Sequence, residues 1–351
     1  MNLSDFHYTL PEGMIARYPL PTRSESRLLC VEAETLHHQH RRFFELLDLL
    51  QPNDLLVFND TKVLPARLFG HKPTGGRVEI LIERLLDNHQ ILVQLHASKS
   101  PKVGSTIHFD HDITFEVITR QDAFYVLQYH APQDRSHLSL LAAIETIGKV
   151  PLPHYMHREP DETDRERYQT VYAKRDGSVA VPSAGLHFDE ALLAAIKAKG
   201  VNFAYLTLHI GAGTFAPIRV ADPTQHQMHA EYVELSEATC DVIHATKAQG
   251  GRVIVVGTTT LRALESASQS GELRPFSGET RLFIYPGVPF HSPVDVLITN
   301  LHLPGSTLLM LVCALGGQAA VMDAYTTAVR EGYRFYTYGD AMWVPRDRAI
   351  C

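Results

Sequence analysis

The sequence predicts a mixed α/β protein that is interrupted by a small all-β domain. Two observations lead to this prediction. Strand and helix periods alternate along the second half of the chain, whereas residues 66–130 carry only short strand patterns separated by Gly, Asn and Asp turns. The length of 351 residues also suits two domains. We therefore expect residues 1–64 and 150–351 to form one discontinuous α/β domain, and residues 65–149 to form an inserted β domain.

The first elements lead to a polar loop. We expect a short strand at 28–32, a helix at 43–50, where apolar residues recur at helical spacing, and a second strand at 54–58. Asn59, Asp60 and Thr61 follow that strand, and these residue types are common in helix caps and ligand loops. Asp60 is therefore a candidate polar contact for a ligand.

The inserted segment has the pattern of a small barrel or sandwich. Its strand-like stretches are ARLFGHK, RVEILIER, ILVQLHA, STIHF, ITFEVI and AFYVLQYH. Positions 62–102 hold seven basic and three acidic residues, although the whole chain has a net charge of −7. Such charges are commonly a solvated strand face. The functional alternative is contact with RNA phosphates through Lys72, Arg77 and Lys102.

After the insertion, helices and strands alternate. Helices are expected at 138–147, 189–199, 237–249 and 261–268 and from 307 onwards, and strands at 201–210, 252–256 and 281–284. The aromatic stretch YRFYTYGDAMWV at 333–344 predicts a strand followed by Gly339 and Asp340.

The segment LTLHIGAGTF at 206–215 is typical of a buried strand that ends in a ligand loop. His209 lies near the strand's end, and Gly211 and Gly213 would let backbone N–H groups approach a bound group, with positive φ at no cost. The glycine spacing also fits a dinucleotide-binding fingerprint, but Pro217 argues against the helix that this motif requires. A strand followed by a plain turn is the third interpretation.

A second candidate loop is VIVVGTTTLRALES at 253–266, where an apolar strand leads into a helix. Thr258, Thr259 and Thr260 can cap this helix, whose N-terminus can hold a carboxylate or phosphate. Arg262 adds a bidentate donor for such an anion. Capping without any ligand explains the threonines equally well.

Two histidine-containing stretches complete the candidates. In HQMHAEYV, the spacing of His226, His229 and Glu231 matches no zinc-binding helix motif, so we expect hydrogen bonding or acid–base chemistry and no metal. A purely structural role is the alternative. In ITNLHLPGST, Asn300 and His302 lie in a loop between a strand and a buried helix. Such loops commonly bind ligands, although a lone histidine is more often structural.

Composition narrows the class of protein. The longest apolar run, at 308–315, is far shorter than the roughly 20 residues of a membrane helix. Early charged residues leave no room for a signal-peptide core, and the four cysteines form no C-x-x-C pair. We expect a cytoplasmic enzyme without a membrane segment.

Taken together, these stretches resemble the S-adenosylmethionine:tRNA ribosyltransferase-isomerase family of queuosine biosynthesis. The resemblance covers nearly the whole chain and rests on YPLPTRSESRLL, NDTKVLPARLFG, TGGRVEILIER, ERYQTVYA, SVAVPSAGLHF, LTLHIGAGTF, HQMHAEYV, VGTTTLRALES, ITNLHLPGSTLLMLV and YRFYTYGDAM. It implies an open-barrel-like α/β main domain with an inserted antiparallel β-barrel. It also implies that S-adenosylmethionine is consumed as a ribosyl donor, without a prosthetic group.

The implied reaction moves and rearranges the ribosyl group onto 7-aminomethyl-7-deazaguanine at the tRNA wobble position, giving epoxyqueuosine-tRNA, adenine and methionine. The sulfonium acidifies the C5′ protons, so a base must remove one and a proton donor should help adenine to leave. We expect His209 or Glu231 as the base, assisted by His229 and His302. The expected substrate contacts are Gly211, Gly213, Thr214, Thr258, Thr259 and Arg262, with Asp60, Asn300 and Asp340 as further polar contacts.

Two other functions fit parts of the sequence. An S-adenosylmethionine-dependent RNA methyltransferase would use the same donor but release S-adenosylhomocysteine. A non-enzymatic tRNA-binding protein would bind RNA without consuming the donor, although the acidic total charge and the polar loops argue against it. We expect the protein to act on tRNA as a monomer.

Overall fold

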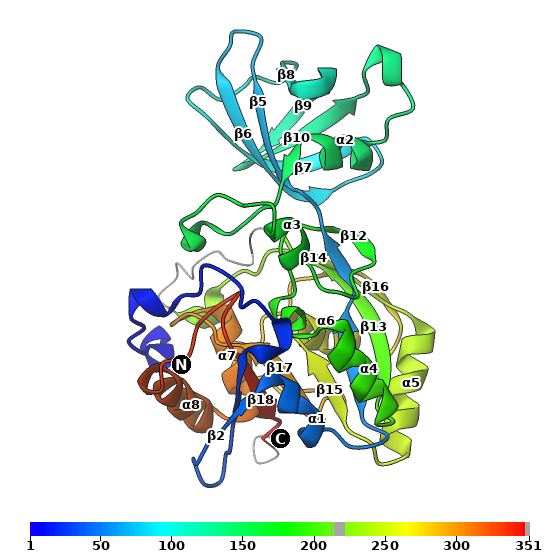
Figure 1. Cartoon of the computed structure of the whole chain (residues 1–351). Helices are drawn as coiled ribbons and strands as arrows, with labels where there is room; N and C mark the ends of the chain where they lie inside the picture. The colour runs from blue at the N-terminus through cyan, green and yellow to red at the C-terminus, as the bar shows by residue number, and fades with distance from the viewer. Residues whose placement is uncertain (212, 214–221, 348–351) are drawn as a thin grey trace.

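The computed structural model describes residues 1–211, 213 and 222–347. It has an α/β body built on a nine-stranded sheet, with a β-barrel above the body in the view of Figure 1. In spatial order, the strands of the sheet are β16 (Phe276–Thr280), β14 (Glu231–Leu235), β13 (Asn202–His209), β3 (Leu55–Asn59), β15 (Val253–Val256), β17 (Val296–Asn300), β18 (Ala341–Pro345), β1 (Arg27–Cys30) and β2 (Gln39–Arg42).

The centre of the sheet is parallel and its flanking strands are antiparallel. β13, β3, β15 and β17 run in one direction, so their carboxyl ends lie at the same edge. β14 runs against β13, and β18 runs against β17 with Asn300 opposite Ala341, so both of these strands begin at that edge. We call it the site edge, because ligands bind beyond the carboxyl ends of parallel strands in α/β sheets.

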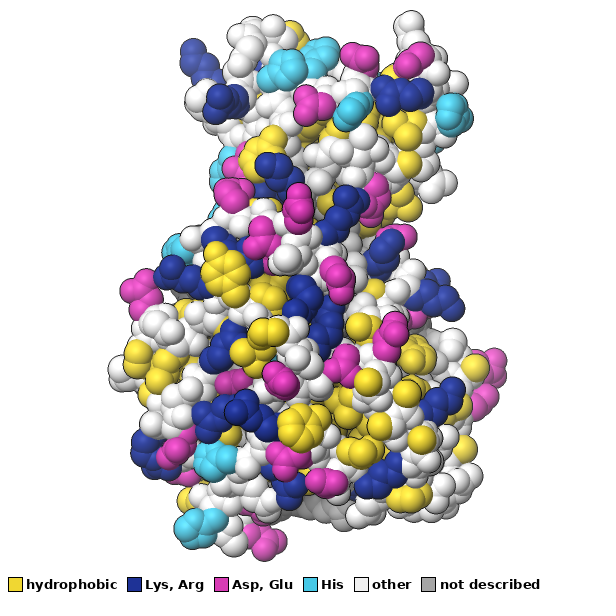
Figure 2. Space-filling view, viewed as in Figure 1, with side chains coloured by type: hydrophobic (Ala, Val, Ile, Leu, Met, Phe, Trp, Pro, Cys, Tyr) yellow, Lys and Arg dark blue, Asp and Glu magenta, His cyan; other side chains and the backbone are white. Residues whose placement is uncertain are grey.

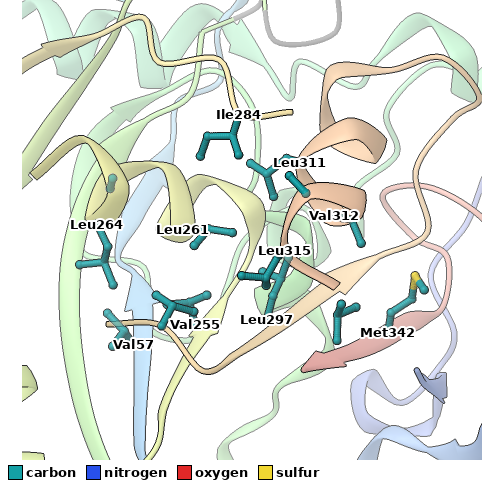
Figure 3. Close-up of a cluster of buried hydrophobic side chains, with 14 of the residues drawn as sticks. Val57, Val255, Leu261, Leu264, Ile284, Leu297, Leu311, Val312, Leu315 and Met342 are labelled. Carbon is teal, nitrogen blue, oxygen red and sulfur yellow. The ribbon is translucent and has the colours of Figure 1, made fainter. Parts of the chain in front are cut away.

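Alternate residues of the central strands face different helices. Leu55 and Val57 of β3 point into a cluster with α5 (Glu237–Ala248), α6 (Thr258–Ala267), α7 (Thr307–Gly316) and α8 (Gln318–Arg330). Leu56 and Phe58 point to the opposite face, which α1 (Leu46–Leu49) and α4 (Glu190–Ala198) cover. Figure 3 shows the first cluster, with Leu261 of α6 and Leu311 of α7 packed above the sheet. Each buried leucine of this kind stabilises the fold by about 1.5–3 kcal/mol.

The inserted segment forms a closed antiparallel barrel. Its strands, in spatial order, are β11 (Gly148–Lys149), β5 (Arg67–His71), β6 (Arg77–Leu85), β7 (Gln90–Ala97), β10 (Phe124–His130), β9 (Thr114–Gln121) and β8 (Thr106–His108). Pairing of His71 with His108 closes the sheet on itself. α2 (Leu140–Ile147) contributes Leu140, Ala143 and Ile144 to the barrel core. The predicted fold class is therefore confirmed, while the exact domain boundaries stay a prediction.

The chain enters and leaves the barrel beside the site edge. β4 (Thr61–Val63) follows β3 after one residue and leads into the barrel. On the return, α3 (Asp164–Arg167) precedes β12 (Arg175–Ser178), which pairs with β4 in parallel. Within the part of the chain that the structure describes, no helix is both long and apolar enough to cross a membrane.

Two predicted strands are wrong. Residues 281–284 lie in irregular structure after β16 ends at Thr280, because the apolar alternation there serves core packing, with Ile284 buried, and not backbone pairing. The aromatic segment at 333–340 is an irregular loop in which Tyr336 has a φ of 74°. Asp340 therefore precedes the strand β18 and does not follow one.

Candidate functional site

The site edge brings together predicted residues from six strand ends. Asp60 follows β3, His209 ends β13, Thr258 follows β15 and Asn300 ends β17, while Glu231 begins β14 and Asp340 precedes β18. These positions are up to 280 residues apart in the sequence, so sheet topology alone gathers them. Their side chains nevertheless divide into separate groups.

One group lines a small cavity of about 40 Å³. Thr258, Thr259, Asn300 and His302 contribute to its wall, together with Val181, Pro182, Ser183, Ala184, Ile210, Gly257, Thr299, Leu308, Tyr336 and Thr337. Asn300 is held firmly, because its Nδ2 donates to the carbonyl oxygens of Tyr336 (2.8 Å) and Thr337 (3.1 Å). The cavity thus has a fixed amide in its wall.

His187 orients Asn300 from the other side, and the sequence analysis gave it no role. Its Nε2 lies 3.2 Å from Asn300 Oδ1, and its Nδ1 lies 2.6 Å from Ser26 Oγ. The ring also stacks on Phe43. Burial lowers the pKa of His187 to about 4, so the ring is neutral at pH 7. Its motif SVAVPSAGLHF predicts a loop, but no spacing within it indicates a partner on β17.

His302 is also a neutral, buried histidine. Its Nε2 lies 2.8 Å from Thr299 Oγ1, and burial lowers its pKa to about 3. Its backbone N–H donates to the Tyr325 hydroxyl at 2.9 Å, and its carbonyl oxygen accepts from the Tyr8 hydroxyl. At neutral pH the uncharged ring can form a hydrogen bond with a ligand. It is not an imidazolium ion, so it cannot act as a cationic proton donor.

The helix after β15 begins earlier than predicted. α6 starts at Thr258 with Gly257 as its N-cap, at a φ of 95°, and no side chain caps it. The predicted capping by threonines is therefore wrong. Thr260 Oγ1 donates to the carbonyl oxygen of Val256 at 2.6 Å, and Thr259 Oγ1 accepts from Asn59 Nδ2 at 3.3 Å. The α6 N-terminus lies at the small cavity, where an anion would be favoured.

A larger cleft of about 450 Å³ lies between the barrel and the body. The barrel contributes Arg67, Leu81 and Gln94; the returning chain contributes Pro151, Leu152, Pro153, His154, Tyr155 and Val179; and the body contributes Gly213, His229, Leu303 and Tyr336. Tyr336 lines both cavities, so the two adjoin. Among the four predicted catalytic side chains, His229 belongs to the described lining of this cleft and His302 to that of the small cavity.

Glu231 and Arg262 form a buried ion pair. Both side chains are 2% exposed, and Arg262 Nη1 contacts Glu231 Oε2. Arg262 Nε donates to the carbonyl oxygen of Leu282 at 3.3 Å. The guanidinium therefore joins α6 to β14 and to the segment after β16, and neither partner is among the described residues that line the two cavities.

His209 and Asp60 form another group on the strand face opposite Ile210. His209 Nδ1 lies 2.8 Å from Thr61 Oγ1, and Asp60 Oδ1 accepts from Thr207 Oγ1 at 2.6 Å. Burial lowers the pKa of His209, although Asp60 opposes this shift. Neither residue belongs to the described lining of the small cavity or of the larger cleft.

The glycines after β13 lie against side chains of the barrel and of the body. A Cβ on Gly211 would lie 2.5 Å from Oε1 of Glu83, and one on Gly213 would lie 2.4 Å from the His229 ring. Gly211 has no positive φ, so the conformational freedom of glycine is not used there. A side chain at Gly213 would collide with the His229 ring, whereas one at Gly211 would displace the flexible end of Glu83. Thr214 lies outside the described residues.

Asp340 and the three basic residues expected to contact tRNA, Lys72, Arg77 and Lys102, are not in the described lining of these two cavities. Asp340 accepts hydrogen bonds from the backbone N–H groups of Arg27 and Arg334, at 2.9 and 2.8 Å, and burial raises its pKa. Lys72 Nζ donates to the carbonyl oxygen of Lys99, three residues before Lys102, so the β5–β6 turn and the β7–β8 loop share one end of the barrel. Figure 2 shows Lys, Arg and His side chains interspersed with Asp and Glu on the outer end of the barrel.

Comparison with known proteins places this arrangement in a family. The model of the queuosine biosynthesis protein family matches residues 3–344. The chain belongs to this family. A solved structure of an S-adenosylmethionine tRNA ribosyltransferase from Thermotoga maritima shares 33% sequence identity with it, over 97% of this chain and 99% of that chain, with a TM-score of 0.55. The resemblance identified from the sequence is therefore confirmed.

In this queuosine biosynthesis protein, sequence reasoning missed the cleft residues that the barrel and the returning chain provide. His154 and Tyr155 belong to a proline-rich segment without a catalytic spacing, and Leu81 and Gln94 belong to ordinary strand patterns. Within the described ranges, no group of three or more His, Cys, Asp or Glu side chains is placed to hold a metal ion.

Proposed function

We propose that the protein transfers the ribosyl moiety of S-adenosylmethionine onto 7-aminomethyl-7-deazaguanine at the wobble position of tRNA and isomerises it, releasing adenine and methionine. One observation carries the proposal. Two adjoining cavities lie at the site edge of a chain that is 33% identical, over almost its full length, to an S-adenosylmethionine tRNA ribosyltransferase. S-Adenosylmethionine is then a substrate, and we propose no prosthetic group.

We assign removal of the C5′ proton to His229. Its ring lines the larger cleft, whereas the two bases expected from the sequence are engaged elsewhere: Glu231 with Arg262, and His209 with Thr61. The sulfonium makes the C5′ protons acidic, so an imidazole within reach is a suitable base. The Glu231–Arg262 pair fixes the start of β14, two residues after His229, and so helps to hold this ring.

The small cavity is proposed to hold the polar parts of the donor. The N-terminus of α6 offers backbone N–H donors to a carboxylate. Both N–H groups of the Asn300 amide already donate to backbone carbonyls, so this side chain can only accept a hydrogen bond from a ribose hydroxyl through Oδ1. The neutral His302 ring adds one further polar contact. The nucleobase of the tRNA then enters through the larger cleft, beside His154 and Tyr155.

The decisive experiment identifies the released products. Purified protein is incubated with tRNA that carries preformed 7-aminomethyl-7-deazaguanine and with labelled S-adenosylmethionine. We expect equal amounts of adenine and methionine and a ribosyl-derived mass added to the tRNA. Release of S-adenosylhomocysteine would show a methyltransferase, and tRNA binding without donor consumption would show a non-enzymatic binding protein.

Single-turnover adenine release tests the assignment of the base. We expect His229→Ala to lose at least 100-fold in rate and His209→Ala to lose less than 10-fold, since general-base catalysis typically contributes about 10²–10⁴-fold. A His229→Ala variant with near wild-type turnover would refute the assignment. If His209→Ala and Glu231→Ala both keep near wild-type rates, the bases expected from the sequence are wrong.

We further propose that the protein works in the cytoplasm as a monomer and contacts tRNA phosphates through Lys72, Arg77 and Lys102. The grouping of the loops that carry these side chains at one end of the barrel supports the last point. Light scattering during size-exclusion chromatography, with and without tRNA, tests the oligomeric state.

A further inference from the structure

A carboxylate of the barrel packs against the glycine segment of the body. Glu83 lies in β6 and is 7% exposed. Its Oε1 accepts a hydrogen bond from the backbone N–H of Gly213 at 3.4 Å, and its Oε2 accepts one from Gln94 Nε2, also at 3.4 Å. Gly213 and Gln94 both line the larger cleft. Glu83 therefore connects two parts of the cleft wall that belong to different parts of the fold.

The backbone at Gly211 is shaped to admit this carboxylate. A Cβ at Gly211 would come within 2.5 Å of Glu83 Oε1, and the backbone there does not otherwise require glycine. Gly213 admits the His229 ring in the same manner. Each glycine thus has its own side-chain partner: Glu83 comes from the barrel and His229 from the body.

The barrel also approaches His229 directly. The Phe124 ring, in β10, lies edge-on to the His229 ring with 6.5 Å between centroids. Two barrel side chains, Glu83 and Phe124, therefore converge on the segment and the ring that form one wall of the cleft. The barrel is thus positioned to influence chemistry in the body as well as to bind RNA.

We propose that Glu83 is a positioning residue, which sets the place of Gly211 and Gly213 and, through Gly213, the orientation of the His229 ring. The proposal rests on the function proposed above and deepens it, because it makes the inserted barrel part of the catalytic machinery. A carboxyl group suits this task, since its two oxygens can accept from the body and from the barrel at the same time.

The first test compares two substitutions of the same residue. Glu83→Ala removes the acceptor and should lower the single-turnover rate of adenine release about 10–100-fold, because misplacing a catalytic group by about 1 Å can cost about 100-fold. Glu83→Gln keeps an acceptor oxygen and should stay within about fivefold of wild type. The dissociation constant for substrate tRNA should change less than twofold in both variants.

A matched control lies in the same barrel. Glu116 in β9 pairs with His130, and their side chains are 40% and 50% exposed, so Glu116→Ala should leave the rate unchanged. If Glu83→Ala keeps the wild-type rate, the proposal is wrong. If Glu83→Gln is as slow as Glu83→Ala, the charge acts on the substrate and a positioning role is refuted.

The second test couples Glu83 to its glycine. Gly211→Ala should slow adenine release by displacing the carboxylate, but it should add little to Glu83→Ala, because the clash no longer exists. Gly213→Ala clashes with His229 instead, so it should remain costly in the Glu83→Ala background. Equal penalties for Gly211→Ala with and without Glu83 would overturn the proposal.

Failure of the proposed function gives a different result. If the wild-type protein releases no adenine, the proposed function is wrong. The thermal midpoints of the wild type, Glu83→Ala, Gly211→Ala and the double variant still show whether the two positions are coupled. Additive midpoints would then refute the packing on which the positioning role depends. Circular dichroism of each variant identifies any that do not fold, and Glu83→Gln remains as the conservative probe.

Discussion

Replacing Arg262 by Met should destabilise the α/β body severely. The Arg262 and Glu231 side chains are each 2% exposed, and their ion pair joins α6 to β14. The substitution leaves the Glu231 carboxylate buried without its cation, and breaking a buried pair in this manner costs about 3–5 kcal/mol. At about 2–4 °C per kcal/mol for a domain of about 150–250 residues, the thermal midpoint should fall by roughly 6–20 °C.

Removing both charges should restore most of the lost stability. Glu231→Leu combined with Arg262→Met fills similar volumes with apolar atoms, and such replacements of buried pairs are often neutral or stabilising. Arg262 Nη2 is buried and has no hydrogen-bond partner in the part of the chain that the structure describes, so the wild-type pair does not recover its full desolvation cost. We expect the double variant to lie within about 2 kcal/mol of wild type.

Urea unfolding followed by circular dichroism measures all four proteins of this cycle. The reasoning would be refuted by a double variant that loses the sum of the two single losses, or by an Arg262→Met change below about 1 kcal/mol, the range of an exposed pair. The double variant also separates structure from chemistry. If it folds and still releases adenine within 10-fold of wild type, Glu231 is not the base.

Three further predictions concern pH, backbone and charge. Burial lowers the pKa of His187 to about 4 and of His302 to about 3, so below about pH 6.5 the unfolded state binds more protons. The contribution of the two neutral histidines to the free energy of unfolding should be fully present above that pH, and it should fall toward pH 4 by about 1 kcal/mol per pH unit for each histidine. In His302→Gln, the urea midpoint should therefore depend less steeply on pH than in the wild type. Gly257 has a φ of 95° and a ψ of 147°, a backbone conformation that strains any residue with a Cβ. Gly257→Ala should therefore lower the free energy of unfolding by about 1–3 kcal/mol, although the atom nearest to the new Cβ is 3.6 Å away. An unchanged free energy of unfolding would contradict this expectation. Neutralising Lys72, Arg77 and Lys102 together should make the negative slope of log K for tRNA binding against log salt concentration shallower by about 2–3. An unchanged slope would place the tRNA contact elsewhere on the protein.

Local sequence patterns were sufficient to predict strands that end at the site edge. The central strands β3, β13 and β15 contain short apolar runs that end in polar loops, and each was expected near its observed position. A strand was also expected before the loop that holds His302, but Asn300, which was placed in that loop, is the last residue of β17. The segment at 281–284 shows where this reasoning fails. Leu282 and Ile284 alternate as strand residues do, but burial requires only apolar side chains, whereas a strand also requires a partner for its backbone, and the pairing with β14 stops at Thr280.

The candidate site was predictable in its location and not in its contacts. Arg262 was expected to bind an anionic ligand, yet it pairs with Glu231, because a buried guanidinium needs a carboxylate and β14 presents one. Sequence spacing cannot show this, since the pair is separated by 31 residues and joins a helix to an antiparallel strand. The role of His187 could not be predicted from sequence spacing either, because its partner Asn300 is 113 residues away.

The place of the insertion explains why the barrel reaches the chemistry at all. β3 ends at Asn59 on the site edge, and β4 begins at Thr61, so the chain leaves for the barrel within two residues of one of the four parallel central strands. The return through residues 151–155 adds a second wall of the larger cleft. In RVEILIER, Val78, Ile80 and Ile82 fill the barrel core, which turns Glu83 outward, yet it is 7% exposed. An outward carboxylate that is buried must contact another layer, and here that layer is the glycine segment after β13. An insertion anywhere on the opposite edge of the sheet would leave the cleft without its barrel wall and Gly211 without the side chain that it accommodates.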